Sequence, residues 1–126
     1  MGEGKMKIVK KSEREMWQTE TAKGFEYPFG ATNIDCAVVE VNGRHPVSGW
    51  YRNTKVDEMV FVKNGSLTIC FKEKPPVKLT ENDAVFIGKN EWHYWAENSK
   101  GTYVAMCNPA WSKIQSENKK TISTEM

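Results

Sequence analysis

Short runs of alternating apolar and polar residues, separated by turn signals, dominate the chain, and a helical period of 3.6 residues is almost absent. Apolar side chains at every second position are typical of strands with one buried face. The pattern predicts strands over residues 33–41, 56–62, 66–71, 77–79, 84–87, 92–95 and 102–107. The only segments that favour helix are 11–17 and the polar tail after Trp111, which we expect to be frayed or helical.

Turn residues indicate how these strands connect. Asn42-Gly43 and Asn64-Gly65 suit tight turns that need a positive φ, so we expect the strand over 66–71 to return antiparallel to that over 56–62. The segment 72–76 should leave the ladder, since its prolines have no N–H to donate. Many short strands with frequent turns indicate an all-β sandwich or barrel.

The length of 126 residues is that of one domain, and 39% hydrophobic residues supply enough apolar material for one core. We expect a single domain over 1–126, with the folded body at about 7–111 and a polar C-terminal tail at 112–126.

The net charge of +2 lies in the ends of the chain. Residues 1–14 carry +3 and residues 112–126 carry +1, whereas residues 15–111 carry −2. A protein that binds nucleic acid concentrates Lys and Arg on its folded body, so we expect no nucleic-acid partner. No apolar run approaches the length of a membrane span, and the N-terminal residues lack the apolar stretch of a signal peptide. We therefore expect a cytoplasmic protein with no membrane partner.

Three cysteines, Cys36, Cys70 and Cys107, are widely spaced, and no C-x-x-C occurs. This pattern argues against a disulfide framework and a zinc ribbon, and reduced thiols fit a cytoplasmic location.

The stretch from Tyr51 to Gly65, YRNTKVDEMVFVKNG, resembles the first motif of the cupin family. In that motif an H-x-H pair is followed by four residues and a Glu, then by six residues and a Gly. Glu58 and Gly65 have this spacing, and the two histidine positions fall on Tyr51 and Asn53. The resemblance implies a jelly-roll β-barrel whose motif side chains converge on one interior point.

The second cupin motif, a Gly-Asp turn, a strand, a Pro-x-Gly turn and a His, corresponds here to Asn82-Asp83, 84–87, Gly88 to Asn90 and His93. Asparagine stands at both glycine positions and Gly88 stands where proline is usual. Asparagine tolerates positive φ well, so these changes should leave the fold intact.

A typical cupin holds a divalent metal with three histidines and one carboxylate, whereas this chain has only two histidines in all, His45 and His93. The resemblance leaves Asn53, Glu58 and His93 as candidate metal ligands. Amide and carboxylate oxygens are hard ligands, so we expect a divalent ion such as Mn, Zn or Fe (or Mg) to be held weakly or not at all. The alternative is that Glu58 simply satisfies a buried His93 by a hydrogen bond.

Strand alternation extends this candidate site. Trp95 should share a face with His93 and could stack on a flat or sugar-like ligand, although core packing is the commoner role for such an aromatic. Val60 has the parity of Glu58 and should form an apolar cavity floor, while Met59 and Phe61 on the opposite face suggest a dimer contact. His45, beside Pro46, should be exposed or structural.

Three functions remain open. The first is a barrel that binds a small polar metabolite, a sugar or organic acid, through Tyr51, Asn53, Glu58, Val60, His93 and Trp95, with a weakened or absent metal. The second is a metal-dependent isomerase, epimerase or dioxygenase, with Tyr51 and Glu58 as candidate catalytic residues. The third is a regulatory or scaffolding cupin whose interior is filled by side chains. In each case we expect a homodimer.

Overall fold

The computed structural model describes residues 4–121, and its regular secondary structure is almost entirely antiparallel strand, so the all-β prediction is confirmed. The strands are β1 (Glu15–Gln18), β2 (Ala22–Glu26), β3 (Asp35–Asn42), β4 (Trp50–Asn53), β5 (Asp57–Phe71), β6 (Lys74–Thr80), β7 (Ala84–Ile87), β8 (His93–Trp95), β9 (Lys100–Asn108) and β10 (Ser116–Lys119). Two single-turn 3-10 helices, η1 (Lys11–Glu13) and η2 (Lys113–Gln115), flank the first and last strands.

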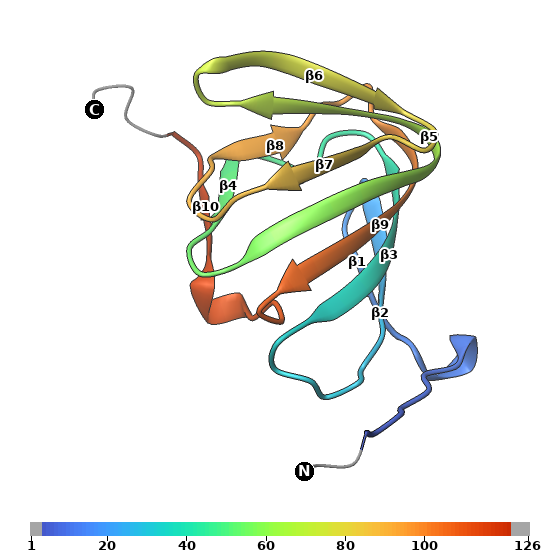
Figure 1. Cartoon of the computed structure of the whole chain (residues 1–126). Coiled ribbons are helices and arrows are strands. Elements are labelled where there is room, and N and C mark those ends of the chain that lie inside the picture. Colours follow the sequence, from blue (N-terminus) through green and yellow to red (C-terminus); the bar gives the residue numbers. More distant parts are fainter. Residues whose placement is uncertain (1–3, 122–126) are drawn as a thin grey trace.

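The strands form one continuous antiparallel sheet that curls into a half-barrel (Figure 1). Its main path runs β1-β2-β3-β9-β5-β8-β4-β10, and β6 and β7 join it through β5. The central strand β5 pairs with β9 and β7 through its first half and with β6 and β8 through its second half. The two halves of the sheet therefore share one strand, which brings β4 and β8 opposite β2 and β3 (Figure 1).

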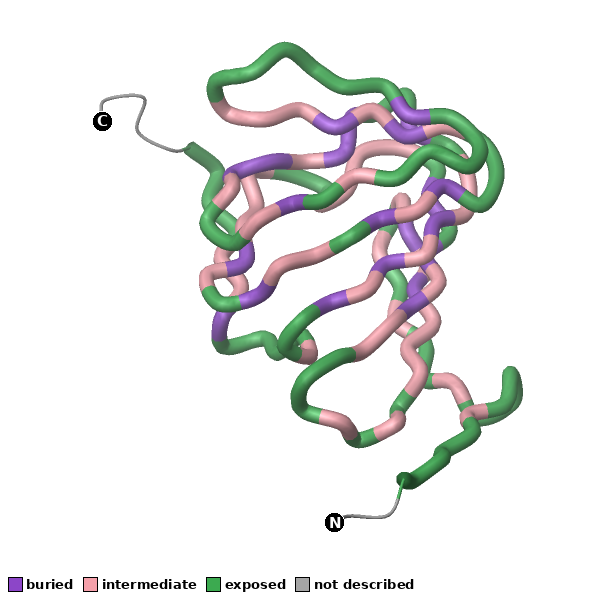
Figure 2. The backbone as a smooth tube through the Cα atoms, in the orientation of Figure 1, coloured by how far each residue is buried: buried purple, intermediate pink, exposed green. Residues whose placement is uncertain are grey.

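The core follows the period-two alternation that the sequence indicates. Along β3, Ala37, Val39 and Val41 are buried while their neighbours are more exposed, and β9 repeats the pattern with Tyr103 and Ala105. Figure 2 shows this alternation of buried and more exposed positions along the central strands. Inward side chains from both halves of the sheet therefore form one core.

The sequence prediction of a hairpin at Asn64-Gly65 is wrong, because 57–71 is a single bent strand. The pairing with β9 shifts register between Val62 and Asn64, as at a β-bulge, and Gly65 has φ of 81°. The bulge changes the parity of the buried positions from Val60 and Val62 to Leu67 and Ile69. A bulge and a hairpin both use residues that accept positive φ, so the local signal was the same.

The chain ends also differ from the prediction. Residues 11–17 contain η1 followed by the start of β1 instead of one helix, and β1 pairs with β2. The tail is not frayed or helical as a whole, since β10 pairs antiparallel with β4. The folded body therefore extends beyond residue 111 to at least residue 119.

Two turn predictions are confirmed. Asn82 has φ of 73° and Asn90 has φ of 69°, and they are the only non-glycine residues with positive φ among the described residues. These are the positions where the sequence places asparagine in a turn that usually carries glycine.

Between residues 4 and 121 the structure contains no helix with the length and apolar character needed to cross a membrane.

Candidate functional site

An open cavity of about 720 Å³ lies on the concave side of the half-barrel. Its wall is formed by β-strand residues, by the loop after β2, and by residues from the chain segment after β9. The polar and aromatic lining residues include Trp17, Glu26, Asp35, His45, Tyr51, Glu58, His93, Trp95, Cys107 and Trp111.

Glu58 lies in this wall at the start of β5, paired with Ile87 on one side and Cys107 on the other. Burial is the main reason that its pKa rises from 4.5 to about 7, and the nearby carboxylates of Asp35 and Glu26 raise it further. The Cys107 thiol lies 3.9 Å from the Glu58 carboxylate as a weak donor. Glu58 is thus a carboxyl group that exchanges a proton near neutral pH.

His93 lies in the wall on β8 and is only 3% exposed. Its Nδ1 is 2.8 Å from the Glu91 carbonyl oxygen, and because a carbonyl only accepts, Nδ1 carries the proton. Burial lowers the pKa of His93, which favours the neutral ring. Neutral His93 therefore has an unprotonated Nε2, a hydrogen-bond acceptor.

Tyr51 pairs with His93 across β4 and β8, and the two rings meet edge to face at 5.8 Å. Its hydroxyl donates to Asn53 Oδ1 at 3.1 Å and accepts from Trp111 Nε1 at 2.8 Å. Burial is the first cause that raises the pKa of Tyr51 to about 12. The phenol stays protonated at neutral pH, so it can position a ligand but is a poor general base.

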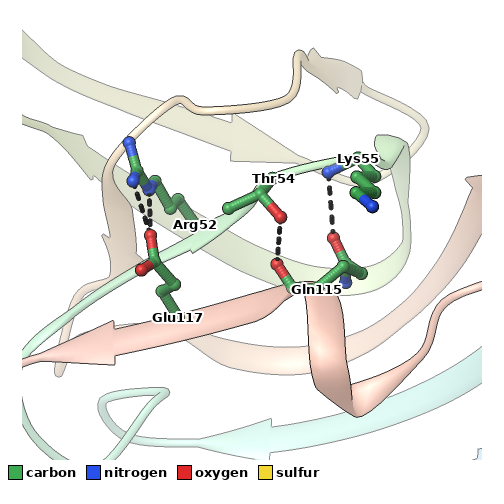
Figure 3. Close-up of polar contacts among 5 residues, drawn as sticks. All are labelled: Arg52, Thr54, Lys55, Gln115 and Glu117. Carbon is green, nitrogen blue, oxygen red and sulfur yellow. Dashed lines mark hydrogen bonds and ion pairs between the residues drawn. The ribbon is translucent and has the colours of Figure 1, made fainter.

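Asn53 is 3% exposed, and its side chain lies behind Tyr51 and outside the cavity wall. Besides the Tyr51 hydroxyl, Gln115 Nε2 donates to Asn53 Oδ1 at 2.9 Å. Gln115 itself is held by the pairing of the tail with β4. The Thr54 hydroxyl donates to the Gln115 carbonyl oxygen at 2.6 Å, and Arg52 Nε donates to Glu117 Oε1 at 2.6 Å. Both contacts are drawn in Figure 3.

Two further predicted residues lie in different surroundings. Trp95 lines the cavity and packs edge to face on Tyr103 with the ring centroids 5.4 Å apart. Val60 is fully buried in the hydrophobic core and does not line the cavity, so Ala37, Val39 and Ala105 supply apolar wall in its place.

The structure places His45, which the sequence led us to expect as exposed or structural, in the cavity wall. Its ring stacks on Trp17 at 5.6 Å and lies 5.2 Å from Trp95, and its backbone bridges Trp95. Burial is the main cause that lowers the pKa of His45 from 6.5 to about 4. A lone residue in a turn-rich segment carries no periodic signal, so only the tertiary pairing identifies it.

The acidic residues Glu26 and Asp35 were also missed. Both line the cavity, and burial is the first cause that raises the pKa of each. With Glu15 and Glu58 they give the wall four carboxyl groups. Among the described residues the wall contains no Lys or Arg.

The donor set does not fit a cupin metal centre. Of the three candidate ligands, Asn53 Oδ1 already accepts two hydrogen bonds and does not line the cavity. Within residues 4–121 no group of three or more His, Cys, Asp or Glu side chains is placed to hold an ion. Glu58 and His93 alone offer fewer protein ligands than structural or catalytic metal sites use.

Solved structures identify the class of fold. The chain resembles an RmlC-like cupin from Shewanella frigidimarina over 87% of this chain and 96% of that one, with 13% identity and a TM-score of 0.70. The polyketide cyclase RemF from Streptomyces resistomycificus matches with 16% identity and a TM-score of 0.71, covering 96% and 89% of the two chains. The protein therefore has the cupin fold, as the motif spacing predicts.

A variant of Streptomyces PAC13 with uridine is more similar in structure, with 16% identity, a TM-score of 0.79 and 95% coverage of both chains. Pac13, also similar to this chain in a second solved structure, is a nucleoside dehydratase. No family model matches the present sequence, and no curated protein matches it.

Proposed function

We propose that the cavity binds a small, neutral, hydroxylated molecule of about nucleoside size and does so without a metal. The observation that carries the proposal is the charge of the wall, which has four carboxyl groups and no Lys or Arg among the described residues. A buried anion needs a cationic or hydrogen-bonding partner, so an organic acid or a phosphorylated ligand is disfavoured. Hydroxyl groups, in contrast, can donate to these carboxylates.

Size and aromatic content support the same proposal. A cavity of about 720 Å³ lies within the usual range for small-molecule sites, and three of its lining side chains are indoles, Trp17, Trp95 and Trp111. Indole faces suit a flat ring or the apolar face of a sugar. A solved relative of the same fold holds uridine, which joins a flat ring to a hydroxylated sugar. The filled interior of the scaffolding alternative does not match this open cavity.

The test compares uridine with uridine 5′-monophosphate, which differ by one phosphate. Titration calorimetry and the fluorescence of the cavity tryptophans should report binding of uridine, with the monophosphate at least about tenfold weaker. D-Ribose and uracil, added separately, show whether both halves contribute. Equal or tighter binding of the monophosphate, or binding of simple organic acids in preference to uridine, would contradict the proposal.

The raised pKa of Glu58 favours a second candidate, an acid–base enzyme acting on a hydroxylated carbonyl compound. In its first step the ionised Glu58 takes a proton from the carbon next to the substrate carbonyl, and the electron pair left on carbon forms an enolate. Incubating D-ribose with the protein in D₂O and following the C2 proton by NMR tests this step. Exchange that disappears in Glu58→Gln supports the enzyme, whereas unchanged exchange in that variant excludes this role.

A further inference from the structure

His45 is held rigidly at the cavity wall although its imidazole makes no hydrogen bond to the described residues. Its backbone N–H donates to the Trp95 carbonyl at 3.0 Å, and the Trp95 N–H donates back at 2.8 Å. The Trp17 indole stacks on the ring with an interplanar angle of 23°, and that indole is fixed because its Nε1 donates to Glu26 at 2.8 Å. The ring is therefore preorganised.

The two ring nitrogens of His45 are not equivalent. Nδ1 is buried and has no partner within residues 4–121, so Nε2 is the nitrogen left to face the cavity. A buried N–H without an acceptor is costly, and a bare acceptor nitrogen less so, which places the proton of the neutral ring on Nε2. His45 thus offers the cavity an N–H donor.

His93, in contrast, offers the cavity a hydrogen-bond acceptor. Its Nδ1–H is fixed on the Glu91 carbonyl, so its Nε2 is a bare acceptor in the same wall. Both imidazoles line the same cavity. Trp95 connects them, because it bridges His45 and lies two residues after His93 on the same face of β8.

We propose that His45 and His93 act as a fixed donor–acceptor pair that selects a planar ring carrying both a hydrogen-bond acceptor and an N–H or O–H donor, the pattern of a cyclic amide or imide. His45 Nε2–H donates to the ring carbonyl, and His93 Nε2 accepts from the ring N–H. The proposal rests on the proposed function for the identity of the ligand. The tautomers of His45 and His93, in contrast, can be measured in the ligand-free protein.

Nitrogen-detected NMR of the histidine rings in the ligand-free protein tests the pair directly. The expected result is the Nε2–H form for His45 and the Nδ1–H form for His93, each assigned by loss of its signals in a single His→Phe variant. An Nδ1–H form of His45, or a protonated ring at neutral pH, would overturn the proposal whether or not any ligand binds.

The second arm measures calorimetric affinity for uridine and for 3-methyluridine, in which the ring N–H is blocked. Methylation and His45→Phe should each weaken binding by about five- to tenfold, the value of one hydrogen bond, and His45→Gln, which keeps a donor, should weaken it less. His45→Phe should not lower the urea midpoint of unfolding, because phenylalanine keeps the stacked ring and removes the unpaired Nδ1.

The outcomes separate the two proposals. Failure of the wild-type protein to bind uridine contradicts the nucleoside-sized ligand, and the NMR result still decides the pair. Unchanged uridine affinity in His45→Phe, or unchanged affinity for 3-methyluridine, overturns the pair while leaving the proposed function standing.

Discussion

Gly65 on β5 and Gly101 on β9 face each other so closely that neither can carry a side chain. A Cβ on Gly65 would overlap the carbonyl oxygen of Lys100, and one on Gly101 would overlap that of Asn64. Gly65 also has φ of 81°, which an L side chain rarely adopts. Gly65, the last residue of the first cupin motif, therefore allows the bent strand β5 to approach β9 closely.

The Gly65→Ala variant should lower the free energy of unfolding by about 2–4 kcal/mol, because the strand must move and the backbone is strained. Gly4→Ala is the matched control, since a Cβ there meets nothing within 4 Å, and it should change stability by less than about 0.5 kcal/mol. Urea unfolding followed by circular dichroism measures both. Equal stability of the two variants would contradict the role given to Gly65.

This contact also shows where sequence reasoning stops. Asn64-Gly65 predicts a turn, and Gly65 does have a turn-like φ, but the chain continues as a bulged strand. Whether such a pair closes a hairpin or bends a strand depends on which distant strand lies alongside, here β9. In contrast, the positive φ of Asn82 and Asn90 follows from local sterics, and it could be predicted.

Some residues of the candidate site could likewise be predicted from local sequence patterns, and others could not. Motif spacing and strand parity located Glu58, His93 and Trp95 in one wall, because alternation along a strand is a local property. His45 reaches that wall through a loop and the pairing of its backbone with Trp95, so no local pattern marks it. Asp35 begins β3 with the parity of Ala37 and Val39, so strand alternation does mark its side. Buried carboxyl groups without cationic partners are likewise visible only once the wall is assembled.

One buried side chain of the tail makes several hydrogen bonds. Gln115 is 6% exposed and its amide donates to Asn53 Oδ1 and to the Ser112 carbonyl, while its Oε1 accepts from the Lys55 N–H. Gln115→Ala should therefore lower the free energy of unfolding by about 2–3 kcal/mol. Its neighbour Ile114 is 87% exposed, and Ile114→Ala should have little effect. Thermal unfolding distinguishes them, and similar melting temperatures would show that the tail is not held as described.

The raised pKa of Glu58 gives the protein a pH-dependent stability. The folded state binds the Glu58 proton more tightly than the unfolded state, in which the pKa of Glu58 is about 4.5. This contribution is complete below pH 4.5 and is lost as pH rises to about 7, with a slope of at most about 1.4 kcal/mol per pH unit. The lowered pKa of His45 acts in the opposite direction, since its contribution is lost as pH falls from 6.5 towards about 4.

Comparison of variants isolates the Glu58 contribution from that of the histidines. Glu58→Gln should gain stability relative to the wild type as pH rises from about 4.5 to 7, and the difference should level off above that range. Glu81→Gln, an exposed change in the turn after β6, is the control. A constant difference between Glu58→Gln and the wild type across the range would show that the carboxyl is not perturbed by folding.

The expected homodimer has a specific candidate face. Cross-strand pairing aligns Phe86, Met59, Met106 and Cys36 in one apolar row, with Phe86 63% exposed and Met59 48% exposed. A charge in this row should prevent association, so we expect Met59→Lys to be monomeric in sedimentation velocity, with Lys78→Glu on exposed β6 unaffected. A wild-type protein that is monomeric at high concentration would contradict the dimer, and a dimeric Met59→Lys would exclude this face.

The replaced histidine pair leads to a prediction about metal. Tyr51 and Asn53 occupy the two histidine positions of the motif, and their side chains bond to each other at 3.1 Å. Because Asn53 is also held by Gln115, we expect protein purified without chelator to hold far less than one transition metal per chain by elemental analysis. Near-stoichiometric metal would contradict this expectation and would restore the metal-dependent enzyme.

Grafting the missing ligands tests whether the barrel still has the geometry of a metal site. The double variant Tyr51→His/Asn53→His restores both motif imidazoles, and the one at position 51 would share the wall with Glu58 and His93, giving the three protein ligands of a catalytic zinc site. It should gain tight Zn²⁺ binding in calorimetry, and adding Glu58→Gln should weaken that binding strongly because one charged ligand is lost. Circular dichroism checks that the fold is kept. A folded double variant that still fails to bind Zn²⁺ would mean that the four motif positions no longer converge, and that more than the histidine pair separates this site from a metal-binding cupin.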